Sequence, residues 1–309
     1  MIKVKKDILL SEFSNYKIGG PASYFFAAKN DGEIIEAVKW AKDKKLPIFI
    51  LGGGTNLLIS DSGFDGLVLK PDINFLEVSG NKITAGAGVL MADLLKFCIK
   101  NNLSGLEWAG GLPGTLGGAV RGNAGAFGGE VKDSIESVKS FNTKDQKIIN
   151  RKNSGCRFGY RSSIIKEKNG AEIVLSATLK LQKGDSGKIK SAIAEKIDYR
   201  KERHPLEYPN IGSIFKNIEL KSFSPSLRKN LASMVKTDPI PVVPVAFLIS
   251  EAGLKGISFG GAMISPKHPN FIVNVLEAKA IDVLSLINLV KLEIKKKYKV
   301  DLEEEVQIV

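Results

Sequence analysis

The sequence predicts an α+β protein built from three successive segments, and three observations support this. Short apolar runs typical of strands are mixed with stretches whose apolar residues recur at helical spacing. Pro71-Asp72 and His204-Pro205 interrupt these patterns and mark the segment boundaries. Residues 105–130 hold ten of the 31 glycines of the chain, a density that needs a local reason.

The glycine-rich stretch, residues 105–130, is predicted to be an ordered loop rather than a linker. Apolar residues are spaced between its glycines, whereas flexible linkers are rich in Ser and lack such anchors. Glycine allows positive φ and close approach of the backbone to a ligand. The stretch therefore suits the binding of a large polar ligand through backbone N–H groups. A glycine-rich packing loop between two sheets is the alternative.

The first segment contains a second candidate binding loop. A strand over residues 24–28 is followed by a helix capped by Asp31, with Ile34 and Val38 on one face. The apolar run 47–51 predicts a buried strand that ends in Gly52, Gly53, Gly54, Thr55 and Asn56. Such a strand and glycine loop commonly holds phosphate. The loop does not fit GxGxxG, and the chain contains no GxxxxGK[ST].

The remaining elements follow from the same patterns. Strands are expected at 66–69, 75–78, 82–85, 135–141, 147–149, 173–181 and 271–275, with a last strand at the C-terminus. Helices are expected at 90–100, around Ile193 and Ile197, at 246–252 and at 280–297.

Composition limits the classes of function. The formal charge of +12 suits an anionic ligand, but the lysines are scattered and lack the interleaved aromatic residues of a nucleic-acid platform. Two cysteines and two histidines form no metal-binding pattern, so we expect no metal. No apolar run is long enough to span a bilayer and no signal-peptide pattern opens the chain. We therefore expect a cytoplasmic protein that binds neither nucleic acid nor membrane.

Seven motifs, in this order, resemble the UDP-N-acetylenolpyruvoylglucosamine reductase family over essentially the whole chain. They are NYKIGG at 15–20, LGGGTNLL at 51–58, GLPGTLGGA at 111–119 running into GNAGA at 122–126, FGYRSS at 158–163, GSIFKN at 212–217, EAGLKG at 251–256 and KHPNFIVN at 267–274.

The resemblance implies an FAD-binding fold of the vanillyl-alcohol-oxidase (PCMH) type with two α+β subdomains, plus a C-terminal α+β substrate domain. The corresponding ranges are 1–70, 71–203 and 204–300, with the strand of 301–309 returning to the first. It also implies noncovalent FAD, NADPH as cosubstrate, a UDP-sugar substrate and a role in peptidoglycan precursor synthesis. We expect a monomer.

The family's catalytic positions match Arg161, Ser213 and Glu305. By resemblance, Ser213 protonates a substrate carbon after hydride transfer, while Arg161 and Glu305 polarise the substrate carboxylate. A guanidinium suits this task because it binds a carboxylate through two hydrogen bonds. Glu303 and Glu304 are rejected, because the family places its acid directly before Val-x-x, and Val306 follows Glu305.

The other site residues also come from the matching motifs. FAD is expected to bind at Gly52, Gly53, Gly54, Thr55, Asn56, Gly111, Pro113, Gly114, Thr115, Gly117, Gly118, Asn123, Ala124 and Gly125. Lys216, Asn217, Lys267 and His268 are candidates for contacts to the substrate diphosphate or carboxylate.

The chain departs from the family pattern in three places. Residues 222–245 form a longer link than usual, and Gly122 stands where a larger residue is frequent. No tyrosine-bearing insert follows Arg161, which indicates the shorter subtype. Two alternatives stay open: another flavin-linked oxidoreductase of this fold acting on an alcohol or sugar, and a basic binding protein without a cofactor.

Overall fold

The computed structural model describes residues 2–168, 170–237 and 240–309. The chain divides into two compact units, and each is discontinuous in sequence. Unit 1 comprises Met1–Ile8, Ala22–Gly53 and Phe64–Arg200, whereas unit 2 comprises Leu9–Pro21, Gly54–Gly63 and Lys201–Val309. The three-range division expected from the family resemblance stays a prediction.

Unit 1 contains two main sheets. The first has the strand order β1-β2-β5-β3, and its strands β2, β5 and β3 pair in parallel. The second is antiparallel and has the strand order β12-β11-β13-β7-β6. The strands are β1 (Lys5–Leu9), β2 (Pro21–Ala28), β3 (Ile48–Ile50), β5 (Phe64–Pro71), β6 (Leu76–Ser79), β7 (Lys82–Gly86), β8 (Leu103–Ser104), β9 (Gly125–Ala126), β10 (Gly129–Glu130), β11 (Ile135–Asn142), β12 (Lys147–Lys152), β13 (Glu172–Lys180) and β14 (Gln182–Lys183).

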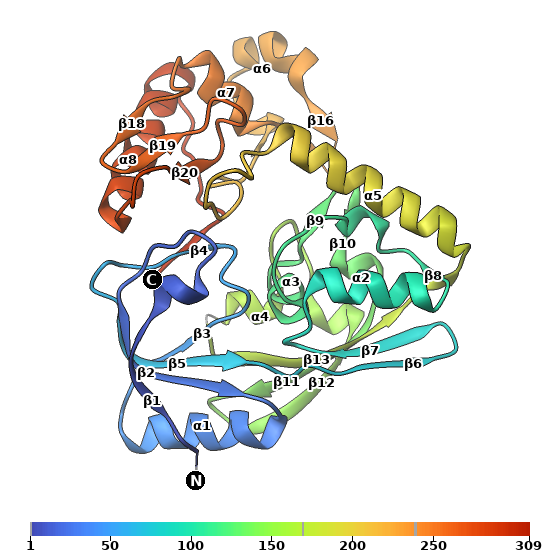
Figure 1. Cartoon of the computed structure of the whole chain (residues 1–309). Helices are drawn as coiled ribbons and strands as arrows, with labels where there is room; N and C mark the ends of the chain where they lie inside the picture. The colour runs from blue at the N-terminus through green and yellow to red at the C-terminus, as the bar shows by residue number, and fades with distance from the viewer. Residues whose placement is uncertain (1, 169, 238–239) are drawn as a thin grey trace. The chain divides into compact units, whose positions relative to one another are not determined.

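The helices of unit 1 bury their apolar faces on these sheets. They are α1 (Asp31–Asp43), α2 (Met91–Lys100), α3 (Leu116–Gly122), α4 (Ile164–Glu167) and α5 (Ser186–Arg203), with 3-10 turns at Glu107–Ala109, Val131–Asp133 and Asn153–Cys156. In Figure 1, α1 lies along one face of the first sheet. Its Ile34 and Val38 pack with Leu67 and Leu69 of β5, as helical spacing of the apolar residues requires.

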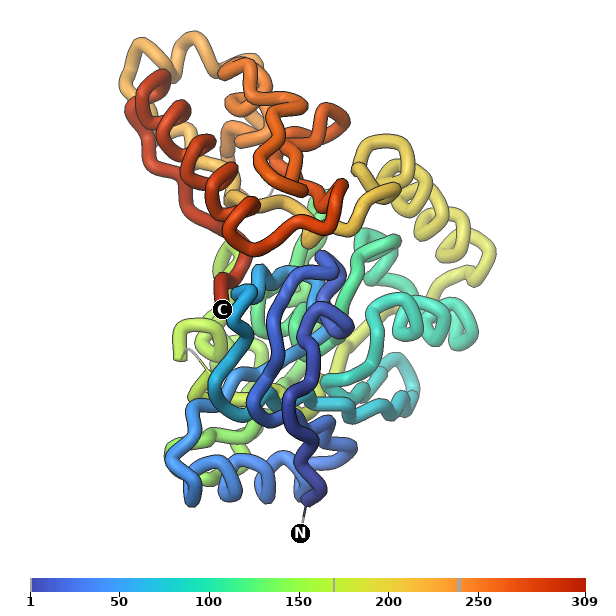
Figure 2. The backbone as a smooth tube through the Cα atoms, turned by 60° about the vertical axis from the view of Figure 1, so that its left-hand side comes forward, coloured from blue at the N-terminus to red at the C-terminus, as the bar shows by residue number. Residues whose placement is uncertain are grey.

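Unit 2 is assembled around the longest helix, α8 (Ala280–Tyr298), which Figure 2 shows as the red coil leading to the C-terminal segment. Its Val283, Ile287 and Val290 are fully buried in one core. The other elements are the 3-10 turns Leu10–Phe13, Leu220–Ser222 and Ala232–Met234, helices α6 (Pro225–Leu231) and α7 (Val245–Glu251), and strands β4 (Leu57–Leu58), β15 (Ile218–Glu219), β16 (Lys236–Thr237), β17 (Pro241–Val243), β18 (Ser258–Phe259), β19 (Ala262–Ile264), β20 (Ile272–Asn274) and β21 (Gln307–Ile308).

The structure corrects two expectations about local structure. The glycine-rich stretch is not a loop throughout, because α3 forms within it: the Thr115 side chain accepts from the Gly118 N–H (3.4 Å), and Asn123 ends the helix at φ 44°. Helix α1 is capped by Asn30 rather than Asp31, since the Asn30 side chain accepts from the Glu33 N–H. Part of the long link at residues 222–245 forms α6, β16 and β17; residues 238–239 lie outside the described part.

The C-terminus returns to the N-terminal part of the chain. β21 pairs in parallel with β4, so Gln307 lies beside Leu57, and the Val309 carbonyl accepts from the Ser60 N–H at 2.7 Å. Both strands belong to unit 2. None of the helices in residues 2–168, 170–237 and 240–309 is long and apolar enough to cross a membrane.

Candidate active site

Arg161 lies at the tip of a tight turn in unit 1. Gly159 and Ser162 exchange backbone hydrogen bonds of 3.0 and 3.1 Å, which leaves Tyr160 and Arg161 as the turn residues. Arg161 has a φ of 53°, a left-handed conformation that few non-glycine residues adopt. Its guanidinium lies 5.3 Å from the centroid of the Tyr160 ring.

The glycine-rich stretch holds this turn in place. The buried Asn123 side chain donates to the Gly159 carbonyl at 2.9 Å, and the Ser163 hydroxyl donates to the Arg121 carbonyl at 2.6 Å. A Cβ added at Gly125 would lie 3.3 Å from a guanidinium nitrogen of Arg161. The structure therefore places Arg161 beside the predicted cofactor loop, within unit 1.

The two predicted cofactor loops also meet within unit 1. A Cβ added at Gly53 would lie 2.7 Å from the Gly114 Cα, so only glycine permits this backbone approach. A Cβ at Gly52 would contact the Thr115 hydroxyl at 3.3 Å. Pro113 lies in the same loop between the 3-10 turn Glu107–Ala109 and α3.

Around α3, some backbone N–H groups are already bonded within the protein, but two glycines leave open space on the helix surface. The Gly117 N–H donates to the Ala87 carbonyl (2.9 Å), and the Ala124 N–H donates to the Ala119 carbonyl (2.9 Å). A Cβ at Gly118 would meet only the Thr115 hydroxyl, at 3.7 Å, and one at Gly122 would meet nothing within 4 Å. Gly118 and Gly122 are four residues apart and share one face of the helix. This face carries no side chains and therefore has room for a large ligand such as a flavin nucleotide. The Gly117 N–H, in contrast, is already bonded to Ala87 and cannot donate fully to such a ligand.

No sequence pattern indicated a binding role for Arg200 of α5, because it lies in a run of charged residues at the end of a helix. Its Nε donates to the Gly110 carbonyl at 2.9 Å, and its guanidinium lies 5.2 Å from the Phe127 ring centroid. Its Nη2 is buried and, among the described residues, has no hydrogen-bond partner. Burial, together with the positive charge of Arg161, lowers the pKa of Arg200. A guanidinium with one buried, unsatisfied nitrogen beside the glycine-rich stretch fits an anionic ligand.

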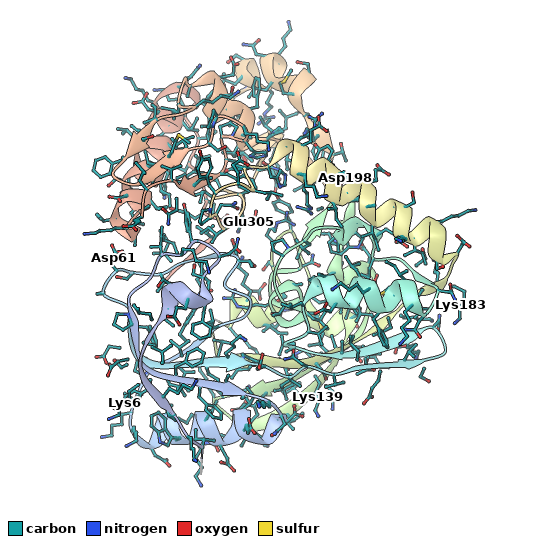
Figure 3. The ribbon with its side chains drawn as sticks, in the orientation of Figure 1. Lys6, Asp61, Lys139, Lys183, Asp198 and Glu305 are labelled. Atoms are coloured by element: carbon teal, nitrogen blue, oxygen red, sulfur yellow. The ribbon has the colours of Figure 1, made fainter. Side chains whose placement is uncertain are left out.

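The backbone that follows Ser213 pairs with the segment of Glu305 in unit 2. The Glu305 N–H donates to the Ile214 carbonyl at 2.8 Å, and the Lys216 N–H donates to the Glu303 carbonyl at 2.9 Å. Between these bonds Phe215 and Glu304 form an antiparallel bridge. Figure 3 labels Glu305 on this C-terminal segment. Ser213 directly precedes the residue to which Glu305 bonds, and it follows Gly212, whose φ of 84° favours glycine.

The end of the first glycine loop belongs to the same unit. Asn56 donates its side-chain N–H to the Glu305 carbonyl at 3.1 Å, and the Gly54 carbonyl accepts from the Asn15 N–H at 2.9 Å. Thr55 lies between them. The predicted cofactor loop 52–56 therefore passes from unit 1 to unit 2 between Gly53 and Gly54.

The predicted substrate lysines and Asn217 already have protein partners. Lys216 forms an ion pair with Glu303, whose side chain is exposed, and Lys267 donates to the Lys201 carbonyl at 2.9 Å. Asn217 accepts from the Val245 N–H at 3.1 Å, at the start of α7. Glu304 pairs with Lys291 at 2.8 Å. Glu303 and Glu304 thus both have basic partners within unit 2.

His268 is held in an aromatic cluster with its ring centroid 5.4 Å from His204 and 4.7 Å from Phe271. Its Nδ1 is buried without a hydrogen-bond partner among the described residues. Burial, aided by the positive charge of Lys236, lowers the pKa of His268 to about 4. At neutral pH, His268 would therefore contact a ligand as an uncharged hydrogen-bonding group. The described residues contain no cluster of His, Cys, Asp and Glu that could hold a metal ion.

Comparisons with known proteins identify the family of the chain. A profile described as an FAD binding domain matches residues 22–150, and one described as the UDP-N-acetylenolpyruvoylglucosamine reductase C-terminal domain matches residues 204–309. The reductase of that name from Clostridium novyi is 38% identical over 99% of this chain and 92% of its own length. The one from Lactobacillus acidophilus is 39% identical over 100% of this chain and 95% of its own length.

A solved structure extends the agreement to the fold. The UDP-N-acetylenolpyruvylglucosamine reductase (MurB) from Thermus caldophilus is 30% identical and superposes with a TM-score of 0.79, covering 100% of this chain and 99% of that one. Matches over the full length, in sequence and in fold, establish the family. The chain belongs to the UDP-N-acetylenolpyruvoylglucosamine reductase family, whose members combine an FAD-binding domain with a C-terminal domain of their own.

Proposed function

We propose that the protein reduces UDP-N-acetylglucosamine enolpyruvate to UDP-N-acetylmuramate, with NADPH as the hydride source, in peptidoglycan precursor synthesis. The observation that carries the proposal is the pairing of the Ser213 loop with the segment of Glu305, because it sets the backbones of the two residues close together within unit 2. When bound, FAD supplies the hydride chemistry, taking hydride from NADPH and passing it to the enolpyruvyl double bond.

The protein's own residues then manage charge and protons. Hydride addition to one carbon leaves carbanion character at the other, next to the substrate carboxylate. Ser213 donates a proton to that carbon as the general acid. Arg161 and Glu305 bind the carboxylate and stabilise the charge that develops on it. Neutral His268, with Lys216, Asn217 and Lys267, contributes to binding the UDP-sugar.

FAD is bound noncovalently in this proposal. The residues that would hold it are those of the two glycine loops: Gly52, Gly53, Gly54, Thr55, Asn56, Gly111, Pro113, Gly114, Thr115, Gly117, Gly118, Asn123, Ala124 and Gly125. The buried Asn123 side chain bonds to Glu130 at 3.0 Å and to Gly159, so its part is to fix the backbone of the loop. Arg200 joins the set through its unsatisfied Nη2.

We further propose that the protein acts in the cytoplasm as a monomer, and that through its product it supports cell shape and cell division. The two buried, unpaired cysteines, Cys98 and Cys156, support a reducing compartment.

The Ser213→Ala variant tests the proposal. Reduction of bound FAD by NADPH needs no protein proton donor at the substrate carbon, so we expect it to proceed at the normal rate. Reoxidation by the enolpyruvyl substrate should slow by about 10²–10⁴-fold, as is typical for loss of a general acid. Stopped-flow absorbance of the flavin follows the two half-reactions in turn.

Ser285→Ala is the matched control, since it removes a half-buried hydroxyl from α8 of the same unit. It should leave both half-reactions unchanged. If the Ser213 variant slowed both half-reactions together, or neither, Ser213 is not the proton donor. Wild-type protein that bound no FAD would refute the enzyme proposal altogether.

A further inference from the structure

We propose that Asn270 is a positioning residue for Ser213, a task that the family resemblance did not assign to it. The inference rests on the proposed function, because the proton transfer that it supports is the one assigned to Ser213. Asn270 follows β19 and precedes β20, and its side chain is buried, with 3% of the residue exposed. Asn270 itself does not contact the reacting atoms; it acts through the backbone of residues 214–215.

The side-chain amide of Asn270 pairs with the Phe215 backbone in the way that a peptide group of a neighbouring strand would. Its Oδ1 accepts from the Phe215 N–H at 3.1 Å, and its Nδ2 donates to the Phe215 carbonyl at 2.9 Å. Its own carbonyl accepts from the Ile214 N–H at 2.8 Å. Three hydrogen bonds from one residue therefore fix the two residues that follow Ser213.

The C-terminal segment pairs with the other edge of residues 214–216. Glu305 donates to the Ile214 carbonyl and the Lys216 N–H donates to the Glu303 carbonyl, so Phe215 is held between Asn270 and Glu304. On the other side of Ser213, the Asn210 side chain accepts from the Gly212 N–H at 3.1 Å. With both neighbours of Ser213 held, its backbone has a defined position relative to the segment of Glu305.

Such restraint bears directly on catalysis. Misplacement of a reacting group by about 1 Å can lower a rate by about 10²-fold. A serine hydroxyl is a weak acid, so its competence depends on its position relative to the substrate carbon. Loss of the Asn270 clamp should therefore slow proton transfer more than it weakens substrate binding.

Asn270→Asp tests this with little change of shape. The carboxylate still accepts from the Phe215 N–H, but it cannot donate to the Phe215 carbonyl and it repels that oxygen. We expect reoxidation of the flavin by the enolpyruvyl substrate to slow at least tenfold, with reduction by NADPH unchanged. Protonation of the introduced carboxyl restores a donor, so the rate relative to wild type should recover as the pH is lowered. Burial raises the pKa of such a carboxyl and brings this recovery into an accessible range.

Asn274→Asp is the matched control. Asn274 is also buried, donates to the Tyr16 carbonyl at 3.1 Å and accepts from the Ala278 N–H at 2.8 Å, and within the described part of the chain its side chain does not bond to residues 212–216. Its variant should lose a similar amount of thermal stability while both half-reactions stay within about twofold of wild type. If N270D and N274D had the same effect on reoxidation, or if N270D slowed both half-reactions equally, Asn270 only stabilises the fold.

Amide hydrogen exchange of the protein as purified, with no substrate added, tests the clamp without turnover. N270D should speed exchange at Ile214 and Phe215 at least tenfold, and N274D should not. If wild-type enzyme failed to reduce the enolpyruvyl substrate, the proposed function would fail, while the exchange result would still decide whether Asn270 holds the loop. Unchanged exchange at both amides would overturn the inference.

Discussion

At the scale of single residues, Glu172 links three segments of unit 1 behind the Arg161 turn. Its carboxylate accepts two bonds of 2.9 Å from Arg151, one of 2.8 Å from Lys168 and one of 2.5 Å from Ser140. Burial alone would raise the pKa of Glu172, but these donors outweigh it and lower the pKa to about 2. Lys168 follows α4, whose Lys166 donates to the Arg161 carbonyl at 2.8 Å. The network therefore supports the segment that carries Arg161.

We predict that Glu172→Gln destabilises the protein by about 1–3 kcal/mol at pH 7, because half-buried Arg151 and Lys168 lose charge-assisted hydrogen bonds to a buried carboxylate. The folded-state pKa lies below the unfolded value of about 4.5, so the carboxylate contributes stability above that value and loses it as the pH falls toward 2. The difference between wild type and variant in urea unfolding should therefore shrink on acidification. Glu195→Gln, which removes an exposed partner of Lys196, should cost less than about 1 kcal/mol. A difference that did not change with pH would contradict this account.

At the scale of elements, α3 depends on where its glycines lie. A Cβ at Gly117 would come within 2.9 Å of the Ala87 Cβ and 3.0 Å of its carbonyl oxygen, both in the packed interior of unit 1. Gly122, at the other end of the helix, has open space. The glycines of one helix therefore have different tasks: Gly117 permits close packing, and Gly122 leaves surface exposed.

Two alanine substitutions separate these tasks. Gly117→Ala should destabilise the apoprotein by about 1–3 kcal/mol through overpacking. Gly122→Ala should stabilise it by about 0.5–1 kcal/mol, since alanine has the higher helix propensity and meets no neighbour. Thermal unfolding of the two apoproteins measures both effects. Destabilisation of equal size in the two variants would mean that crowding does not distinguish these positions.

The sequence predicted most elements, but not those that depend on contacts distant in sequence. Helices with a clear apolar face, such as α1, α2 and α8, form close to where the spacing of their apolar residues placed them. Helix α3 was missed because its glycines disfavour a helix in isolation, and its Leu116 and Gly117 amides bond instead to Val89 and Ala87. The motifs also suggested which residues form the site. They could not indicate that Arg200 has a buried unsatisfied nitrogen or that Asn270 holds Phe215, since both facts depend on tertiary packing.

At the scale of the whole molecule, the net charge of +12 acts on every anionic reactant. NADPH and the UDP-sugar both carry several negative charges, and a basic protein attracts such ligands from solution. Local ion pairs reduce this field but do not remove it: Lys216 and Lys267, for example, lie near Glu303 and Glu207. The excess of cations should therefore affect association more than chemistry.

We predict that the second-order rate constant for reduction of bound FAD by NADPH falls about 3- to 10-fold between 20 and 200 mM NaCl. Salt shortens the range of the attraction between protein and dinucleotide, whereas the rate at saturating NADPH should change little. Stopped-flow traces at a series of NADPH concentrations separate the two quantities. NADH, which lacks one phosphate, serves as the control and should give a shallower dependence on salt. A rate constant that did not respond to salt, or equal slopes for the two dinucleotides, would mean that the charge of the chain serves some purpose other than attracting its substrates.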